Sequence, residues 1–213
     1  MKLKTLTDLQ NFLDSDFSWR SKEISSFNLE VKSPRSKPQK SVIRAGVVLL
    51  YAHWEGFIKN ASRGYLTFIN NKGKVYSDLD MRFLAIGVKN KIGDLRDSQQ
   101  TYSNLETIKY ILEANSKKTK LDFDKAIDME SNLSSSVFKN IAFSIGIDIS
   151  LYSQRFQLID ARLLKQRHAI AHGEKTDIDK GSYIDLSKEV IGLMRQFKTD
   201  IENAASTEKY LAK

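Results

Sequence analysis

Only two prolines occur in this chain of 213 residues, and they stand close together at Pro34 and Pro38. Proline interrupts a helix because its ring removes an N–H donor and clashes with the preceding turn. The remaining chain is therefore free to form long helices, and no sustained alternation of apolar and polar residues indicates a strand. The prolines lie in a Ser- and Lys-rich stretch, 31–41, which we predict to be a basic linker between the first two helices.

Apolar residues recur at intervals of three and four through most of the chain, which is typical of helices with one buried face. We predict helices over 7–27, 39–69, 80–95, 104–114 and 135–145, then from about 150 to the segment 167–173, and finally over 183–204. A long polar surface loop is expected at 115–134 and a frayed tail at 205–213. The sequence thus predicts one all-α domain spanning 1–213, an up-and-down bundle of about six or seven helices.

The composition excludes several classes of protein. The chain has no cysteine, which rules out a disulfide framework, a zinc site with thiolate ligands and thiol catalysis. Its most apolar window, 42–58, contains charged residues and is shorter than the roughly 20 apolar residues that a membrane span needs. Early aspartates, beginning with Asp8, argue against a signal peptide. We therefore expect a soluble, cytoplasmic protein that does not associate with membranes.

The net charge of +8 favours polyanionic partners through long-range attraction. Much of this charge gathers in and beside the predicted linker, which could form a path for nucleic acid or simply a solvated loop. The candidate RNA-binding residues in this region are Lys32, Arg35, Lys37, Lys40 and Arg44.

The segment 162–174 contains two of the three histidines of the chain, together with an arginine and a glycine. On an ideal helix His168 and His172 share one side, whereas Arg167 and His172 are about 140° apart. Arg167 would lie on the flank of the apolar stripe, where a charged group needs a partner. Either the helix loosens at His172, with Gly173 as its C-terminal cap, or Arg167 and His172 meet across a subunit interface.

A purely structural interpretation is also open. A histidine near a helix C-terminus is favourable to the helix dipole, and Arg167 could pair with Glu55 or Asp160. Two histidines four residues apart match half of a metalloprotease motif, but Ala169 stands where that motif has its glutamate base. We therefore predict no metal site and no cofactor.

His53 and Glu55 lie two residues apart on the long predicted helix, about 200° around its axis. Only one of them can therefore face the helix that carries Arg167, unless the other points to a second partner. Glu55 is the candidate to orient Arg167, whereas His53 is expected to be a satisfied packing residue. Trp54 and Phe57 are expected in the core.

The run from Arg167 to Gly173, RHAIAHG, resembles the signature of the HEPN superfamily: an arginine, four residues and a histidine. This superfamily is all-helical and includes many metal-independent endoribonucleases. Residues 44–59 resemble the long-helix segment of a bacterial HEPN-like nuclease family associated with defence and toxin–antitoxin contexts, and the order of elements matches over about 5–205. The resemblance implies that Arg167 and His172 are catalytic and that His168 is the polar residue supporting them.

The implied activity is RNA cleavage by attack of the 2′-hydroxyl, in which histidine transfers protons and arginine binds the phosphate. Because two proton transfers are needed, the resemblance also implies a homodimer with a composite site, whose partners are RNA and an antitoxin or other defence protein. Glu174 stands where HEPN toxins paired with a nucleotidyltransferase antitoxin carry tyrosine, so nucleotide transfer onto that residue is not expected. The alternatives are a non-catalytic HEPN module that binds RNA, a nucleotide or a protein, and a helical interaction protein without a polyanionic ligand.

Overall fold

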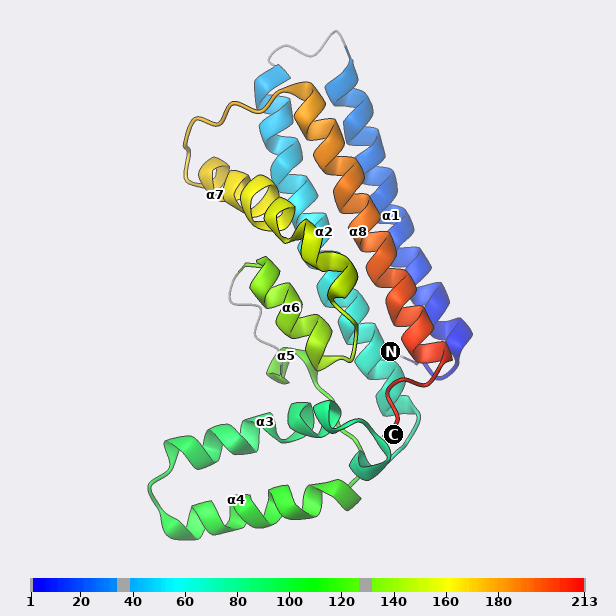
Figure 1. Ribbon diagram of the computed structural model, residues 1–213, viewed down its shortest axis with the longest axis vertical. Helices are drawn as coiled ribbons and strands as arrows, with labels where there is room; N and C mark the ends of the chain where they lie inside the picture. Colours follow the sequence, from blue (N-terminus) through cyan, green and yellow to red (C-terminus); the bar gives the residue numbers. More distant parts are fainter. Residues whose placement is uncertain (1, 34–38, 127–131, 213) are drawn as a thin grey trace.

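The computed structural model describes residues 2–33, 39–126 and 132–212. Three long helices, α1 (Leu6–Lys32), α2 (Gln39–Asn71) and α8 (Lys180–Ser206), run side by side and pack against one another (Figure 1). Shorter helices α6 (Ser135–Ser144) and α7 (Lys165–Ala171) lie beside α2. Within the described ranges the chain forms helices and two isolated β-bridges but no strand. The predicted all-α bundle is confirmed.

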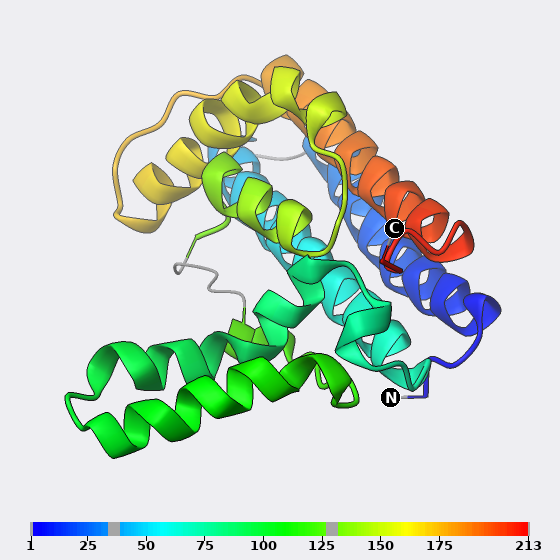
Figure 2. The ribbon, with the colours of Figure 1, turned by 60° about the horizontal axis from the view of Figure 1, so that its bottom comes forward.

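A hairpin of α3 (Met81–Asp97) and α4 (Thr101–Glu113) extends away from this bundle (Figure 2). Asp80 caps the first turn of α3 by accepting a hydrogen bond from the backbone N–H of Arg82. The single turn α5 (Phe123–Ala126) follows the hairpin and leads the chain back to α2. The helices predicted over 80–95 and 104–114 correspond to this hairpin.

The core is built on the apolar face of α2. Trp54 and Phe57 are fully buried, as predicted, and the Trp54 ring lies 5.3 Å from that of Phe138 on α6. The Phe138 ring in turn lies 5.6 Å from the ring of Phe197 on α8. Burial of an aromatic side chain of this size contributes roughly 2–3 kcal/mol. Through Phe138, these contacts join α6 to both α2 and α8.

Helix boundaries differ from the predicted ones where tertiary contacts extend a helix. The first helix continues to Lys32 rather than ending at 27, because Val31 is fully buried and prolongs the apolar stripe. The predicted linker, 31–41, therefore overlaps α1 and α2 at its two ends, and its centre, 34–38, lies outside the described residues.

The described parts of 115–134 are largely irregular, as expected, but they are not wholly a surface loop. Leu121, Phe123 and Leu133 are buried, and Phe123 begins α5. The side chain of Asn70 on α2 accepts from the N–H of Leu121 at 2.8 Å and donates to its carbonyl at 2.7 Å. Leu121, an apolar residue outside any helical spacing, is thus anchored by a polar side chain of α2. Residues 127–131 lie outside the described ranges.

The C-terminal tail is also more ordered than expected. Tyr210 is 2% exposed, and its ring packs edge-on against Phe68 at 6.1 Å. The N–H of Asp80 donates to the carbonyl of Tyr210 at 2.9 Å, and the N–H of Ala212 donates to that of Asp78 at 3.0 Å. The prediction that 205–213 frays is therefore wrong for its described residues. No helix of the described ranges is both long and apolar enough to cross a membrane.

Replacing Tyr210 with alanine should lower the free energy of unfolding by about 3 kcal/mol, because it leaves a cavity against Phe68. Urea denaturation followed by circular dichroism measures this change. The control is Lys209→Ala, which alters an exposed neighbour and should change stability little. Equal stability of the two variants would show that the tail does not contribute to the core.

Candidate functional site

The chain approaches the signature through an irregular helix. Residues Ser150–Arg155 form a 3-10 helix and Leu158–Leu164 a π-helix, and only α7 is regular. The prediction of one uniform helix from about residue 150 is therefore wrong. In the π segment the N–H of Lys165 donates to the carbonyl of Asp160. Single π turns are rare and frequently occur at functional sites.

The carboxylate of Asp160 ties the π segment to α6. It accepts hydrogen bonds from the N–H of Ser135 at 2.7 Å and from its hydroxyl at 2.5 Å. Both carboxylate oxygens therefore engage the first turn of α6, where a negative charge is favourable. The structure thus assigns Asp160 to helix capping rather than to Arg167.

The end of α7 is a Schellman motif. His172 is the C-cap, and Gly173 follows with φ of +76°, a left-handed conformation that glycine adopts without strain. The N–H of Glu174 donates to the carbonyl of Ala169 at 2.8 Å, and that of Gly173 donates to Ile170 at 3.1 Å. The predicted helix end at His172 is confirmed. His172 is exposed at this end.

Arg167 packs on an aromatic ring of α2. Its Cζ atom lies 4.3 Å from the ring centroid of Tyr51, which is 2% exposed. The Tyr51 hydroxyl accepts a hydrogen bond from the N–H of Leu133 at 2.6 Å, which holds the ring in place. A cation over a partly desolvated aromatic face is stabilised by about 1–2 kcal/mol. Arg167 was predicted to need a partner at the flank of the apolar stripe, and that partner is the aromatic ring of Tyr51.

Glu55 lies in the same surroundings. Burial raises the pKa of the Tyr51 hydroxyl to about 12; the Leu133 N–H and the Arg167 charge act against this increase, whereas the nearby Glu55 carboxylate adds to it. Glu55 is half-buried and one helical turn beyond Tyr51 on α2. The structure thus places Glu55 beside the ring that supports Arg167. Sequence reasoning missed Tyr51, although its spacing of four from Glu55 puts both on one face.

A double-mutant cycle should detect the contact between Arg167 and Tyr51. For Arg167→Gln combined with Tyr51→Leu, we expect a coupling of about 1 kcal/mol in the free energy of unfolding. With Tyr51→Phe the aromatic face remains, so most of the coupling should persist, while loss of the hydroxyl leaves the Leu133 N–H unpaired and costs about 1 kcal/mol by itself. Additive effects in the leucine cycle would contradict the contact.

His53 lies on the other side of α2, against α1. It is 3% exposed, its Nε2 atom lies 2.8 Å from Oε2 of Glu23, and its ring is 5.3 Å from that of Trp19. Of the two residues weighed on this helix, only Glu55 is near the signature. The packing role predicted for His53 agrees with this position.

The pKa of His53 is lowered from 6.5, because burial disfavours the protonated ring and outweighs the attraction of Glu23. The unfolded chain therefore binds a proton at this residue more readily than the folded chain does. The resulting stabilisation is present above pH 6.5 and is lost as the pH falls through the lowered pKa.

Urea unfolding between pH 7 and pH 5 should show a smaller loss of stability for His53→Gln than for wild type. A slope unchanged in His53→Gln would contradict the shift.

The two signature histidines lie one above the other on α7. Their ring centroids are 6.1 Å apart and their planes differ by 24°. Arg167 faces Tyr51, so within one chain the arginine and His172 have different surroundings. Nowhere in the described ranges do three His, Asp or Glu side chains gather closely enough to hold a metal ion.

A small second core supports the end of α7. We call it the upper core; Ile170 packs against it, and its buried members are Val31, Ile43, Val47, Ile178 and Tyr183. Ile178 belongs to the connection that follows the signature, and Asp179 caps α8 by accepting from the N–H of Ser182 at 2.9 Å. The apolar residues of this region thus fix where α7 ends relative to α1, α2 and α8.

The predicted RNA-binding residues lie partly beside this connection. Lys40 Nζ is 2.9 Å from Oδ1 of Asp177, and Nη1 of Arg44 donates to the carbonyl of Glu174 at 2.7 Å. Lys32 is exposed at the end of α1. Arg35 and Lys37 lie outside the described residues. Two of the five predicted cations are therefore next to the signature.

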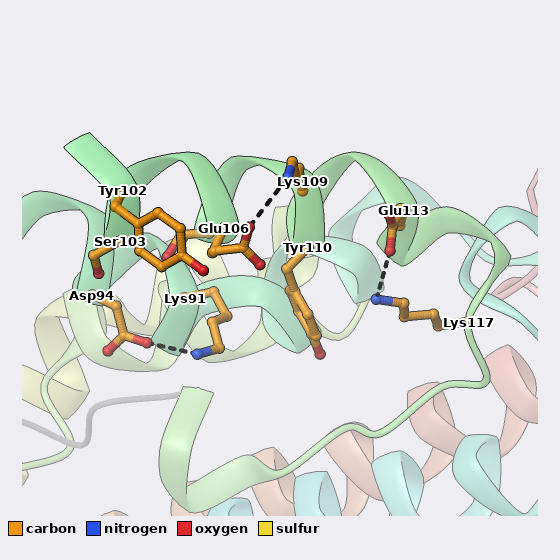
Figure 3. Close-up of a pocket in the computed structure, with 10 residues that line it drawn as sticks. Lys91, Asp94, Tyr102, Ser103, Glu106, Lys109, Tyr110, Glu113 and Lys117 are labelled. Atoms are coloured by element: carbon orange, nitrogen blue, oxygen red, sulfur yellow. Dashed lines mark hydrogen bonds and ion pairs between the residues drawn. The ribbon is translucent and has the colours of Figure 1, made fainter.

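A hollow of about 570 Å³ lies between α3 and α4, away from the signature (Figure 3). Its charged side chains form ion pairs with one another: Lys91 with Asp94 at 3.0 Å, Lys109 with Glu106 at 3.2 Å and Lys117 with Glu113 at 3.3 Å. None of the predicted site residues lines it. Because its charges are balanced, this hollow has no preference for an anion.

The helical bundle and the signature at the end of α7 are both in keeping with a HEPN domain. The HEPN_MAE_28990-like HEPN family matches residues 9–210, which is nearly the whole chain. The chain belongs to this family of the HEPN superfamily. No curated protein and no solved structure gives a significant match.

Proposed function

We propose that this HEPN module is a metal-independent endoribonuclease in which Arg167 and His172 are the catalytic residues. The observation that carries the proposal is the form of the helix end: Arg167 is held on Tyr51, while His172 is exposed at a glycine-terminated cap five residues later. A fixed cation and an accessible imidazole near one helix end suit recognition and cleavage of a phosphodiester.

The reaction needs no nucleophile from the protein. The 2′-oxygen of the ribose attacks the adjacent phosphorus, the P–O5′ bond breaks, and the products carry a 2′,3′-cyclic phosphate and a 5′-hydroxyl. One proton leaves the 2′-hydroxyl and one is delivered to the departing 5′-oxygen, a task for histidine near neutral pH. The Arg167 guanidinium, with its planar set of donors, would stabilise the charge on the phosphate oxygens.

Two proton transfers with one His172 in each chain favour a site built from two copies. In a two-fold dimer both helix ends can meet, so that each cleft receives two arginines and two histidines. The position of α7 on the outside of the bundle supports this arrangement, because a second copy can reach it (Figure 1). A toxin or defence role, restrained by an antitoxin or other defence protein, is the biological setting we propose.

Incubation of the purified protein with total RNA should produce fragments ending in 2′,3′-cyclic phosphate, with equal yield in EDTA. Arg167→Ala and His172→Ala should each reduce the rate by at least about 100-fold, as expected for groups acting in the transition state. The matched control is His53→Gln, which changes a histidine outside the site and should retain activity. Light scattering should give twice the chain mass of 24.3 kDa.

Several results would contradict this function. Full activity of His172→Ala, or abolition of cleavage by EDTA, would exclude the proposed mechanism. If the wild type binds RNA without cleaving it, and both signature variants bind equally well, the module is a binding protein. A monomer that cleaves RNA at the full rate would exclude the composite site.

A further inference from the structure

Arg44 on α2 holds the backbone that follows the signature. Its Nη1 nitrogen donates to the carbonyl of Glu174 at 2.7 Å and to the hydroxyl of Thr176 at 2.9 Å. Hydrogen bonds from a guanidinium are shorter and stronger than those between neutral groups. Glu174 is also the residue whose N–H closes the Schellman motif on Ala169. A single nitrogen of Arg44 therefore reaches the peptide two residues beyond His172.

The same face of α2 also supports Arg167. Arg44, Tyr51 and Glu55 are separated by seven and four residues, so all three lie within about 40° around the helix axis. Tyr51 contacts the arginine of the signature, and Arg44 contacts the chain just after its histidine. One polar stripe of α2 thus fixes both ends of the signature.

The far end of the connection is fixed independently. Ile178 is 8% exposed within the upper core, and Asp179 caps α8. The segment between His172 and Ile178 is therefore held at one end by burial and at the other by Arg44. Without Arg44, the segment from Glu174 to Thr176 would lose its hydrogen bonds to α2.

We propose that Arg44 is a positioning residue, which orients the imidazole of His172 by fixing the backbone from Glu174 to Thr176. This inference rests on the proposed endoribonuclease function. It differs from a direct contact between Arg44 and an RNA phosphate, because Arg44 acts here through a neutral carbonyl and a hydroxyl of its own chain. A positioning residue affects the rate of the chemical step, whereas a phosphate contact affects RNA affinity and its dependence on salt.

Lys40 provides the matched control. It is a second cation of α2 beside the same connection, but it pairs with the side chain of Asp177, and both side chains are largely exposed. Exposed ion pairs contribute little to structure. Lys40→Ala therefore removes one positive charge from this surface without releasing the backbone.

The test compares Arg44→Ala, Thr176→Val and Lys40→Ala with the wild-type protein on one RNA substrate. Arg44→Ala should lower kcat by about 10- to 100-fold with little change in KM. Thr176→Val removes an acceptor of Arg44 without changing charge, and it should lower kcat about fivefold. In Lys40→Ala, which removes a candidate RNA-binding cation, any loss of RNA affinity should appear in KM and in the salt slope, while hydrogen exchange at 173–177 stays as in the wild type. Hydrogen exchange should be faster at amides 173–177 in Arg44→Ala than in Lys40→Ala.

The outcomes separate the two roles of Arg44. The proposal is overturned if Thr176→Val is silent while Arg44→Ala only weakens RNA binding and reduces the salt slope by about 0.7, the value for one phosphate contact on a single strand. It is also overturned if exchange at 173–177 is unchanged in Arg44→Ala. If the wild type cleaves no RNA, the proposed function fails, and hydrogen exchange then decides separately whether Arg44 fixes this backbone. Because Thr176→Val is a mild change, it keeps the test valid if Arg44→Ala unfolds.

Discussion

Burial of the apolar face of α2 is the constraint on which the other helices depend. Trp54 and Phe57 on this helix are inaccessible to solvent, and α1, α8 and α6 are placed by contacts with it. The helix is 33 residues long, so one rigid element reaches from the α3–α4 hairpin to the signature. Because the same helix presents Arg44, Tyr51 and Glu55 toward α7, core packing and site geometry are determined together. A core change that shifts α2 would therefore also move the supports of Arg167 and His172.

Helical periodicity predicted the main elements well because it reflects burial along a single helix. It failed where burial depends on partners far along the chain. Leu121 is held by the side chain of Asn70, and Tyr210 packs on Phe68. Neither buried residue lies in a sequence with apolar residues at helical spacing, so periodicity does not predict its burial. The polar composition of 115–134 and the position of 205–213 at the chain end therefore gave misleading expectations.

The candidate site shows the same division between local and tertiary effects. The helix end at Gly173 could be predicted, because a glycine after a helical run provides the left-handed residue that a Schellman motif requires. The partner of Arg167 could not be predicted, since an aromatic face on another helix competes with two carboxylates that are equally plausible from spacing. Arg44 was assigned to RNA on its charge alone, and only the folded chain shows its hydrogen bonds to the connection after His172.

The π segment Leu158–Leu164 has a consequence for how this site can change by insertion or deletion. A π turn accommodates one residue more than an α turn between hydrogen-bonded groups. Removing one residue within that turn would leave a regular α-helix, and the part that follows would keep its orientation toward the core stripe. The same deletion in a regular helix would rotate everything after it by about 100° and carry Arg167 away from the ring of Tyr51. The π segment is thus the place where the length of the chain before the signature can change by one residue while Arg167 keeps its position.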